Sequence, residues 1–475
     1  MSITSKASQR ITALLDDNSF VEIGALVTAR ATDFDLKHTD TPSDGVITGY
    51  GSIGGSPVYV YSQDASVLNG TVGEMHAKKI ANIYDLALKT GTPVIGLLDS
   101  AGLRLQESTD ALNAFGELYK KQALASGVIP QLTGVFGGCG GGLAVLSAMS
   151  DFTFMEEKSG RLFVNSPNAL AGNTTAKCDT SAADFQCKKT GNVDVAGTEE
   201  DILAQIRLLV SMLPANNTED TLRECEDDLN RVCAGLEGYA GDTGAMLSVI
   251  ADGNLFVEVK KDYAPEMVTG FIKLDGQTVG AVANRSEKLD EEGNVTEKYE
   301  TALSPNGCEK ATEFVKFCDA FNIPVITITN VTGFRACECC ESRIAKAAAS
   351  LTYAFADAIV PKINVVIGKA YGTAYTVMNS KATGADITIA WPGAEIGCMD
   401  AKLAAKIMYE GQGADLIGQK AVEYAQLQNS VTSAARRGYV DQIIEPADTR
   451  KYLIGALEML FTKREERPSK KHGTV

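Results

Sequence analysis

Two kinds of hydrophobic pattern alternate along this chain. Short, unbroken runs of β-branched and other apolar residues are typical of strands buried on both faces. Between these runs, apolar residues recur at helical spacing, as at Ile80, Ile83, Tyr84 and Ala87, which predicts amphipathic helices. The four clearest strand-like runs are Val94–Leu98, Leu132–Phe136, Val325–Thr329 and Ile363–Ile367. Strands that alternate with helices in this way indicate an α/β fold on a mostly parallel sheet.

The same order of elements occurs twice. A predicted helix, a polar turn and a strand lead to Phe20-Val21-Glu22, and the segment ending in Phe256-Val257-Glu258 repeats that order. Gly49–Val58 and Gly270–Val279 each predict a hairpin, one with a Gly-Gly turn and the other with an Asp-Gly turn. A helical pattern follows each hairpin. The two halves of the chain therefore begin in the same order, with a helix, a strand, a hairpin and a second helix.

From Pro93 onward, one ungapped offset of 231 residues relates the two halves. The matched pairs are Pro93 and Pro324, Gly102 and Gly333, Arg104 and Arg335, Glu107 and Glu338, Pro130 and Pro361, Gly137 and Gly368, and Gly141 and Gly372. The chain is therefore predicted to be a tandem duplication of one α/β domain. We place the two domains at residues 1–235 and 236–475, because residues 215–240 are polar and rich in turn formers.

A glycine-rich stretch, Val135–Gly142, joins a predicted buried strand to a short apolar helix. Such a turn exposes unpaired N–H groups at the positive end of a helix, where an anionic oxygen can bind. The second half repeats this arrangement at Ile367–Tyr375, and Gly102 and Gly333 lie just past the end of an earlier strand in each half. The pattern predicts two oxyanion holes, although the same glycines also suit plain turns and close packing.

Composition narrows the classes of function. The 475-residue chain carries a formal charge of -16, which argues against nucleic acid or an anionic membrane surface as a partner. No apolar run is long enough to span a membrane, and the N-terminus lacks the apolar core of a signal peptide. The 11 cysteines are then expected to be reduced thiols in a cytoplasmic protein.

The chain resembles a known family, the carboxyltransferase subunits of biotin-dependent acyl-CoA carboxylases and decarboxylases. The propionyl-CoA carboxylase beta subunit is the best-known member of this family. The stretches that carry the resemblance include Arg10–Glu22, Asp44–Gly51, Gly73–Ala77, Pro93–Glu107, Phe317–Pro324, Lys369–Tyr375 and Ala390–Ile396. They run through nearly the whole chain.

The resemblance implies a pair of crotonase-like (ClpP/crotonase) domains in a homo-oligomer, from dimer to hexamer. It implies that the thioester oxygen of an acyl-CoA binds in the first domain as an enolate forms. The residues that would hold it are Gly140, Gly141 and Gly142, with the loop at Ala101 and Gly102. The equivalent donors of the second domain would hold the ureido oxygen of biotin; they are Gly333, Gly372, Thr373 and Ala374.

The resemblance also implies partners and cofactors. The carboxyl group would pass between carboxybiotin, on a separate biotin carboxyl carrier protein, and the α carbon of a short acyl-CoA such as propionyl-CoA/methylmalonyl-CoA or acetyl-CoA/malonyl-CoA. A biotin carboxylase or a membrane decarboxylase subunit would work with this chain. No biotinylation tetrad, P-loop or dinucleotide fingerprint is present in the sequence.

Several positions depart from the family pattern. Thr373 replaces a glycine and is expected to narrow the biotin side, whereas residues 165–194 differ enough to predict altered substrate contacts. The loop after Gly333 carries Cys337, Cys339 and Cys340. Three closely spaced cysteines invite a metal site, but neither a second pair nor nearby histidines support one, so no metal is expected.

Other constellations have simpler interpretations. Cys139, or a triad of Ser100, His76 and Asp99, is a weak candidate for nucleophilic catalysis, since the sequence gives no sign that the groups meet. Arg104 and Arg335 are expected to form ion pairs with Glu107 and Glu338.

These observations leave three hypotheses for the function. The first is a biotin-dependent carboxyltransferase, or the alpha subunit of a decarboxylase that runs the same transfer in reverse. The second is a crotonase-type lyase or hydratase that needs no biotin, and the third is a non-enzymatic assembly partner.

Overall fold

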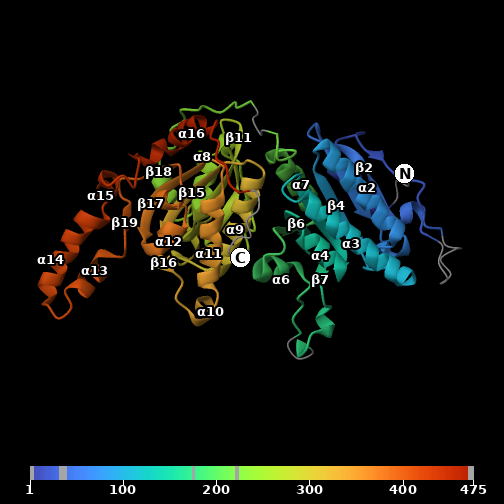
Figure 1. The fold of residues 1–475 in the computed structure, drawn as a ribbon, viewed down its shortest axis with the longest axis horizontal. Coiled ribbons are helices and arrows are strands. Elements are labelled where there is room, and N and C mark those ends of the chain that lie inside the picture. Colours follow the sequence, from blue (N-terminus) through green and yellow to red (C-terminus); the bar gives the residue numbers. More distant parts are fainter. Residues whose placement is uncertain (1–4, 31–39, 174–176, 220–223, 469–475) are drawn as a thin grey trace. The chain divides into compact units, whose positions relative to one another are not determined.

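The computed structural model describes residues 5–30, 40–173, 177–219 and 224–468. The chain forms two compact units, unit 1 (residues 1–220) and unit 2 (residues 221–475). Each is built on one eight-stranded sheet and is described separately below (Figure 1).

The sheet of unit 1 has the order β1-β2-β3-β4-β5-β6-β8, and β7 pairs with β5 beyond the end of β6. The first three strands form antiparallel pairs and the others are parallel. The strands are β1 (Val21–Glu22), β2 (Val46–Ile53), β3 (Ser56–Gln63), β4 (Val94–Ser100), β5 (Gln131–Gly140), β6 (Phe152–Glu156), β7 (Arg161–Phe163) and β8 (Val195–Gly197). The helices are α1 (Lys6–Leu14), α2 (Glu74–Thr90), α3 (Ser108–Ala125), α4 (Gly142–Ala148), α6 (Ala183–Phe185) and α7 (Glu199–Met212).

The sheet of unit 2 repeats this order as β9-β10-β11-β15-β17-β18-β20, and β19 pairs with β17 as β7 does with β5. The strands of this sheet are β9 (Phe256–Val259), β10 (Met267–Leu274), β11 (Gln277–Asn284), β15 (Val325–Val331), β17 (Lys362–Tyr371), β18 (Ile387–Ala390), β19 (Glu395–Gly397) and β20 (Gln442–Ile443). Two separate two-stranded sheets are formed by β12 (Glu287–Leu289) with β13 (Val295–Lys298) and by β14 (Ala302–Leu303) with β16 (Gly333–Phe334). The helices are α8 (Thr243–Ile250), α9 (Pro305–Ala320), α10 (Glu338–Glu341), α11 (Ile344–Asp357), α12 (Gly372–Val377), α13 (Ala401–Met408), α14 (Ala414–Tyr424), α15 (Val431–Arg436) and α16 (Thr449–Leu460). The predicted duplication is confirmed by this shared topology.

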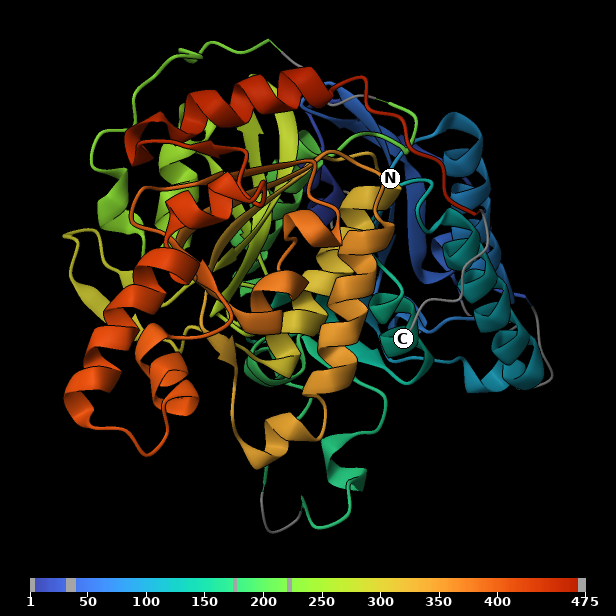
Figure 2. The same cartoon turned by 60° about the vertical axis from the view of Figure 1, so that its left-hand side comes forward.

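Helices pack on the sheets as the hydrophobic pattern predicts. In unit 1, Ile80, Ile83, Tyr84 and Ala87 of α2 are all buried, and the helix ends at Gly91, whose left-handed backbone closes the last turn. Helices α2 and α3 lie side by side, as do α9 and α11 in unit 2 (Figures 1 and 2). The core lies between these helices and the strands.

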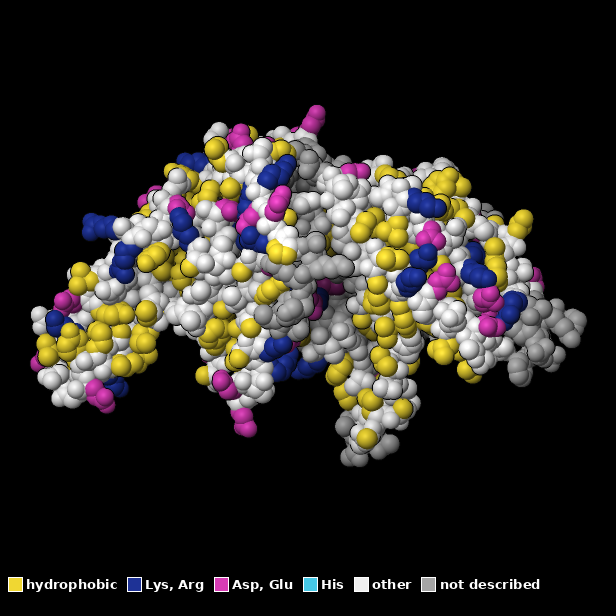
Figure 3. Space-filling view, in the orientation of Figure 1, with side chains coloured by type: hydrophobic (Ala, Val, Ile, Leu, Met, Phe, Trp, Pro, Cys, Tyr) yellow, Lys and Arg dark blue, Asp and Glu magenta, His cyan; other side chains and the backbone are white. Residues whose placement is uncertain are grey.

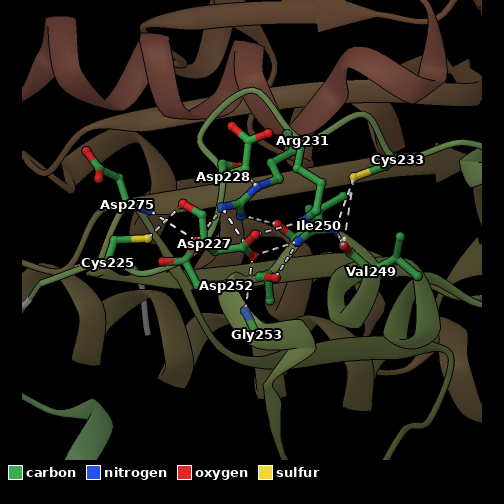
Figure 4. A network of polar contacts seen from close by, with 12 residues as sticks. Cys225, Asp227, Asp228, Arg231, Cys233, Val249, Ile250, Asp252, Gly253 and Asp275 are labelled. Atoms are coloured by element: carbon green, nitrogen blue, oxygen red, sulfur yellow. Dashed lines mark hydrogen bonds and ion pairs between the residues drawn. The ribbon is translucent and has the colours of Figure 1, made fainter.

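Residues 224–235 belong to unit 2, where polar contacts hold them (Figure 4). Arg231 pairs with Asp227 at 3.0 Å and also donates to the carbonyl oxygens of Val249 and Ala251 at 2.9 Å. The Cys233 N–H donates to the Ala447 carbonyl oxygen at 2.9 Å. This segment is therefore fixed to unit 2 by its backbone as well as by its side chains.

Candidate active site

The glycine-rich stretch of unit 1 extends a strand before it turns. The prediction ended the strand at Phe136, but β5 continues to Gly140, because β7 pairs with residues 138–140 along one side. On the other side, Cys139 lies opposite Ser100 at the end of β4. The turn itself is at Gly141, whose φ of 60° favours glycine, and α4 begins at Gly142.

The ends of β4 and β5 converge, as the sequence predicts. Gly102 has a φ of 100°, and a Cβ added to it would lie 3.7 Å from the carbonyl oxygen of Gly140. The candidate donors on the loop at Ala101 and Gly102 are therefore adjacent to the glycine-rich stretch.

Some of the candidate backbone amides donate hydrogen bonds within the chain. Others have no acceptor among the described residues, and these are called open below. The Gly141 N–H, an expected donor, donates to the Phe163 carbonyl oxygen at 2.9 Å, because β7 continues the sheet beside it. The Ala101 N–H donates to the Asn69 carbonyl oxygen at 3.0 Å, and the Gly102 N–H donates to Ser100 Oγ at 3.0 Å. The N–H of Gly142 has no acceptor among the described residues.

The Leu143 N–H was not anticipated from the sequence. It also lies in the first turn of α4 and has no acceptor in the described parts of the chain. Helix geometry was the signal that could have found it, since the first four N–H groups of any α-helix lack an intrahelical partner.

Unit 2 places the repeat-equivalent residues at the same point of its sheet. Val331 of β15 lies opposite Ala370 of β17, and β17 leads directly into α12 at Gly372, whose φ is 62°. The N–H groups of Thr373 and Ala374 have no acceptor among residues that the structure describes. Thr373 is exposed and Ala374 is buried.

Gly333 lies beside this turn. It forms β16, which pairs with β14 through Ala302 and is in contact with α12. The second set of candidate residues, Gly333, Gly372, Thr373 and Ala374, is thus gathered around one strand-to-helix turn.

The two units also support their strand ends with equivalent hydrogen bonds. In unit 1 the Asp99 N–H, near the end of β4, donates to Gln63 Oε1 at 3.2 Å. In unit 2 the Asn330 N–H, near the end of β15, donates to Asn284 Oδ1 at 3.1 Å. A side chain from the second hairpin strand therefore positions the turn in both units.

A cavity of about 720 Å³ lies next to the first turn. Phe163, which accepts the Gly141 N–H, lines it together with polar residues such as Ser166, Asn168 and Lys177. These residues belong to or border the segment 165–194, where the sequence predicts altered substrate contacts; residues 174–176 of that segment lie outside the described part.

No hydrolytic triad assembles from the residues considered above. His76 is fully buried; its ring contacts Gln63 Nε2 at 3.2 Å and the Asp44 carbonyl oxygen at 2.9 Å. Burial lowers the pKa of His76 to about 3, so the ring is neutral at physiological pH. Cys139 is also buried, and burial raises the pKa of its thiol.

The two repeat-equivalent arginines differ. Arg104 is buried and pairs with Glu107 at 2.8 Å, as predicted, and with Asp44 at 2.7 Å. The predicted pairing of Arg335 with Glu338 is wrong: Arg335 pairs with Glu300 at 3.1 Å. Glu300 precedes β14, and the N–H of Arg335 also donates to Leu303 of that strand at 2.9 Å, which orients the arginine toward it.

The cysteines also require a correction. Nine are free, but Cys337 and Cys340 form a disulfide, so the expectation that all 11 are reduced thiols does not hold in this structure. The cause is local: α10 is a single turn capped by Cys337, and this brings two cysteines three positions apart together.

Comparison with known proteins decides the family. A model of the carboxyl transferase domain matches residues 5–475. The chain belongs to this family. It is therefore a carboxyltransferase, and the predicted crotonase-like α/β fold is confirmed.

Named relatives cover almost the whole chain. The propionyl-CoA carboxylase beta chain of Roseobacter denitrificans is 38% identical, with 99% of this chain and 93% of that protein aligned. The methylmalonyl-CoA decarboxylase subunit alpha of Veillonella parvula is 37% identical, with 99% and 92% aligned.

A solved structure shares the fold. The transcarboxylase 12S subunit, whose structure concerns a hexamer with methylmalonyl-coenzyme A bound, is 36% identical and superposes with a TM-score of 0.90 over 98% of this chain and 92% of that one. Among the described residues, no helix is long and apolar enough to cross a membrane.

Proposed function

We propose that this chain is a biotin-dependent carboxyltransferase. It would move a carboxyl group between biotin, carried on a separate protein, and the α carbon of a short acyl-CoA. The observation that carries the proposal is the pair of equivalent strand-to-helix turns, each with open first-turn amides. Two such turns suit a reaction in which two different carbonyl oxygens need stabilisation.

Unit 1 is proposed to bind the acyl-CoA. The Gly142 amide would donate to the thioester oxygen as negative charge develops there, and Gly141 would supply the turn that exposes it. The loop at Ala101 and Gly102 would complete the hole once the Gly102 N–H exchanges Ser100 Oγ for the substrate oxygen. Gly140 precedes this turn, where the Phe163 ring packs so closely that a Cβ would lie 2.8 Å from it. The neighbouring cavity provides room for the substrate.

Unit 2 is proposed to bind biotin. The open amides of Thr373 and Ala374 fit a ureido oxygen, which is a hydrogen-bond acceptor, and the exposed position of Thr373 leaves the turn accessible. Gly333 and Gly372 would flank this oxygen. When bound, biotin supplies the nitrogen that carries the carboxyl group; the chain contributes positioning and backbone donors.

The relatives support both directions of transfer. One is named as a carboxylase of propionyl-CoA and another as a decarboxylase of methylmalonyl-CoA. The same two holes serve either direction, because the enolate is common to both. We therefore propose propionyl-CoA/methylmalonyl-CoA or acetyl-CoA/malonyl-CoA as substrate pairs.

Assembly with other subunits is also proposed. Hydrophobic side chains gather over the α13–α14 hairpin of unit 2 (Figure 3), and several are more than half exposed. They are Leu403, Ile407, Met408 and Val422, together with Leu427 just past the end of α14. Such a surface supports a homo-oligomer, as does the hexamer described for transcarboxylase 12S. A biotin carboxyl carrier protein and a biotin carboxylase or membrane decarboxylase subunit would complete a cytoplasmic machinery, in which units 1 and 2 serve as the two carboxyltransferase domains.

The proposal is tested by incubating the purified chain with free biotin and either malonyl-CoA or methylmalonyl-CoA. Biotin-dependent release of CO₂ is the expected result. Turnover of an enoyl-CoA without biotin would instead favour a crotonase-type lyase. If neither thioester is turned over with biotin present, the proposed carboxyl transfer is contradicted.

A further inference from the structure

Three cysteines lie together in the loop that joins β16 to α11. The sulfur atoms of Cys337, Cys339 and Cys340 are all within 4.8 Å of one another. Cys337 and Cys340 form the disulfide, with their Cα atoms 5.2 Å apart. The Sγ of Cys339, a free thiol, lies 3.2 Å from the Sγ of Cys337. Cys337 is therefore in contact with two possible sulfur partners.

The three cysteines differ in their access to solvent. Cys339 is exposed, Cys337 is half-buried and Cys340 is only 7% exposed. The backbone N–H of Cys340 donates to Cys337 Sγ at 3.3 Å, a contact that also stabilises a thiolate on Cys337. An external reagent thus meets Cys339 first, whereas the bonded pair is the more protected one.

Cysteines elsewhere in the chain lack these features. Cys139, Cys308 and Cys318 are buried, and burial raises the pKa of Cys308 to about 12, which leaves it unreactive. Cys178 and Cys398 are exposed, but no cluster of three ligating groups includes either of them in the described residues.

We propose that Cys337, Cys339 and Cys340 form a thiol–disulfide exchange site, through which small disulfides oxidise the loop and small thiols reduce it. Cys339 is the entry thiol, Cys337 is the central sulfur, and Cys337–Cys340 is the pair in which the oxidised state rests. The proposal concerns the cysteine loop and does not depend on the proposed carboxyl transfer.

Oxidation proceeds in three balanced exchanges. The Cys339 thiolate attacks a small disulfide, R–S–S–R, forming Cys339–S–S–R and releasing RS⁻, which takes up the proton that Cys339 lost. The Cys337 thiolate then attacks the Cys339 sulfur, forming a Cys337–Cys339 bond and releasing the second RS⁻, which takes up the proton of Cys337.

In the last exchange the Cys340 thiolate attacks the Cys337 sulfur. The Cys337–Cys340 bond forms, and Cys339 leaves as a thiolate that takes up the proton of Cys340. Overall, two cysteine thiols are oxidised and one small disulfide is reduced to two small thiols. Reduction runs through the same bonds in the opposite order.

A metal site is a weaker account of the same cluster. A structural zinc site uses four protein ligands, and in the described residues the group contains only the three cysteines. The disulfide also removes two of these as thiolate ligands. Zinc binding by the reduced cysteines is the alternative that the alkylation experiment below would reveal.

The sequence offers a clean readout. Trypsin cleaves after Arg335 and Arg343, so all three cysteines fall in the peptide Ala336–Arg343 and no other cysteine does. The whole chain would be reduced, transferred to oxidised glutathione, alkylated at successive times, digested and weighed by mass spectrometry. In the wild type, the peptide is expected to change from three alkyl groups to one, located on Cys339.

Variants test the order of the steps. Cys339→Ser is expected to form the same Cys337–Cys340 bond about tenfold more slowly, or slower still, because the exposed attacking thiol is lost. Cys340→Ser is expected to stop at a Cys337–Cys339 bond. Cys398→Ser, which removes an exposed thiol elsewhere in unit 2, is the matched control and is expected to oxidise at the wild-type rate.

Three results would overturn the proposal. The first is a wild-type peptide that still carries three alkyl groups after oxidised glutathione has reached equilibrium with the folded chain. The second is Cys339→Ser oxidising as fast as the wild type. The third is a reduced chain that holds one zinc ion and resists alkylation at these positions until a chelator is added.

Discussion

At the residue scale, glycines allow the strand ends to approach polar side chains. A Cβ on Gly137 would lie 2.0 Å from Asp99 Oδ1, and a Cβ on the equivalent Gly368 would lie 2.7 Å from Asn330 Oδ1. Asp99 cannot easily move away, because its carboxylate pairs with the buried Arg10 at 3.0 Å. In both units, therefore, a glycine is needed on the strand that lies beside this polar residue.

Gly137→Ala is expected to destabilise the chain by about 1–3 kcal/mol through overpacking against Asp99. Gly116→Ala is the matched control: Gly116 lies within α3 with open space around it, so alanine there is expected to stabilise by roughly 0.5–1 kcal/mol. Urea unfolding of both variants measures the difference. Equal effects of the two substitutions would contradict the packing argument.

His76 makes stability depend on pH with a definite sign. Its pKa is about 3 in the folded chain because of burial, against an ordinary value of 6.5. Between these values the unfolded chain binds a proton that the folded chain does not, so stability falls as the pH drops below 6.5.

The free energy of unfolding of the wild type, relative to His76→Gln, is expected to fall by up to about 1.4 kcal/mol per pH unit below that point. Urea unfolding of both proteins at several pH values between 7 and 5 measures this difference. A difference that stays constant over this range would mean that the ring is accessible to protons in the folded state.

At the scale of elements, the hydrophobic pattern predicted which segments are strands and helices but not where every strand ends. The hairpins at residues 46–63 and 267–284 match the prediction, because Gly54-Gly55 and Asp275-Gly276 take the positive φ values that such turns require. β5 and β17 extend further than predicted. Their extra residues pair with β7 and β19, three-residue strands too short to leave a periodic pattern.

Another element-scale feature is the anchoring of residues 224–235 near α16. Arg450 of α16 is fully buried; it pairs with Asp252 at 2.6 Å and lies 3.5 Å from Asp227. Arg450→Met is expected to cost roughly 3–5 kcal/mol, because it leaves Asp252 without its buried partner and removes one of the two arginines near Asp227.

Lys451→Met is the control on the same helix, since it removes a surface pair with Asp448 and a cation–π contact with the Tyr452 ring; it is expected to cost less than about 1 kcal/mol. The measurement is urea unfolding of the full-length variants. A loss of similar size in both would show that α16, rather than the buried network, limits the stability of unit 2.

At the scale of the whole molecule, the internal repeat was the most informative part of the sequence. It predicted two units with one topology and placed a candidate turn in each, which the sheet orders match. Hydrogen-bond availability could not be predicted in the same way. Whether an amide is open depends on which carbonyl lies opposite it, and the Gly141 N–H is bonded only because Phe163, 22 positions later in the sequence, folds back beside it.

The disulfide shows a similar limit. The sequence shows Cys337, Cys339 and Cys340 close together and predicts reduced thiols, but the bond between Cys337 and Cys340 depends on the single turn of α10. The sequence therefore located the candidate turns, and backbone geometry determined which of their groups are open.

The central claim, that backbone amides of unit 2 act directly in carboxyl transfer, is tested most directly at Thr373. Proline is tolerated in the first turn of a helix, so Thr373→Pro removes this N–H while leaving α12 in place, whereas Thr373→Ala keeps it. The measurement is kcat for biotin-dependent decarboxylation of malonyl-CoA or methylmalonyl-CoA, with binding of the thioester measured separately. We expect Thr373→Pro to lower kcat by about 10²–10³-fold without weakening thioester binding, and Thr373→Ala to stay near the wild-type rate. Equal rates for the two variants would contradict the account.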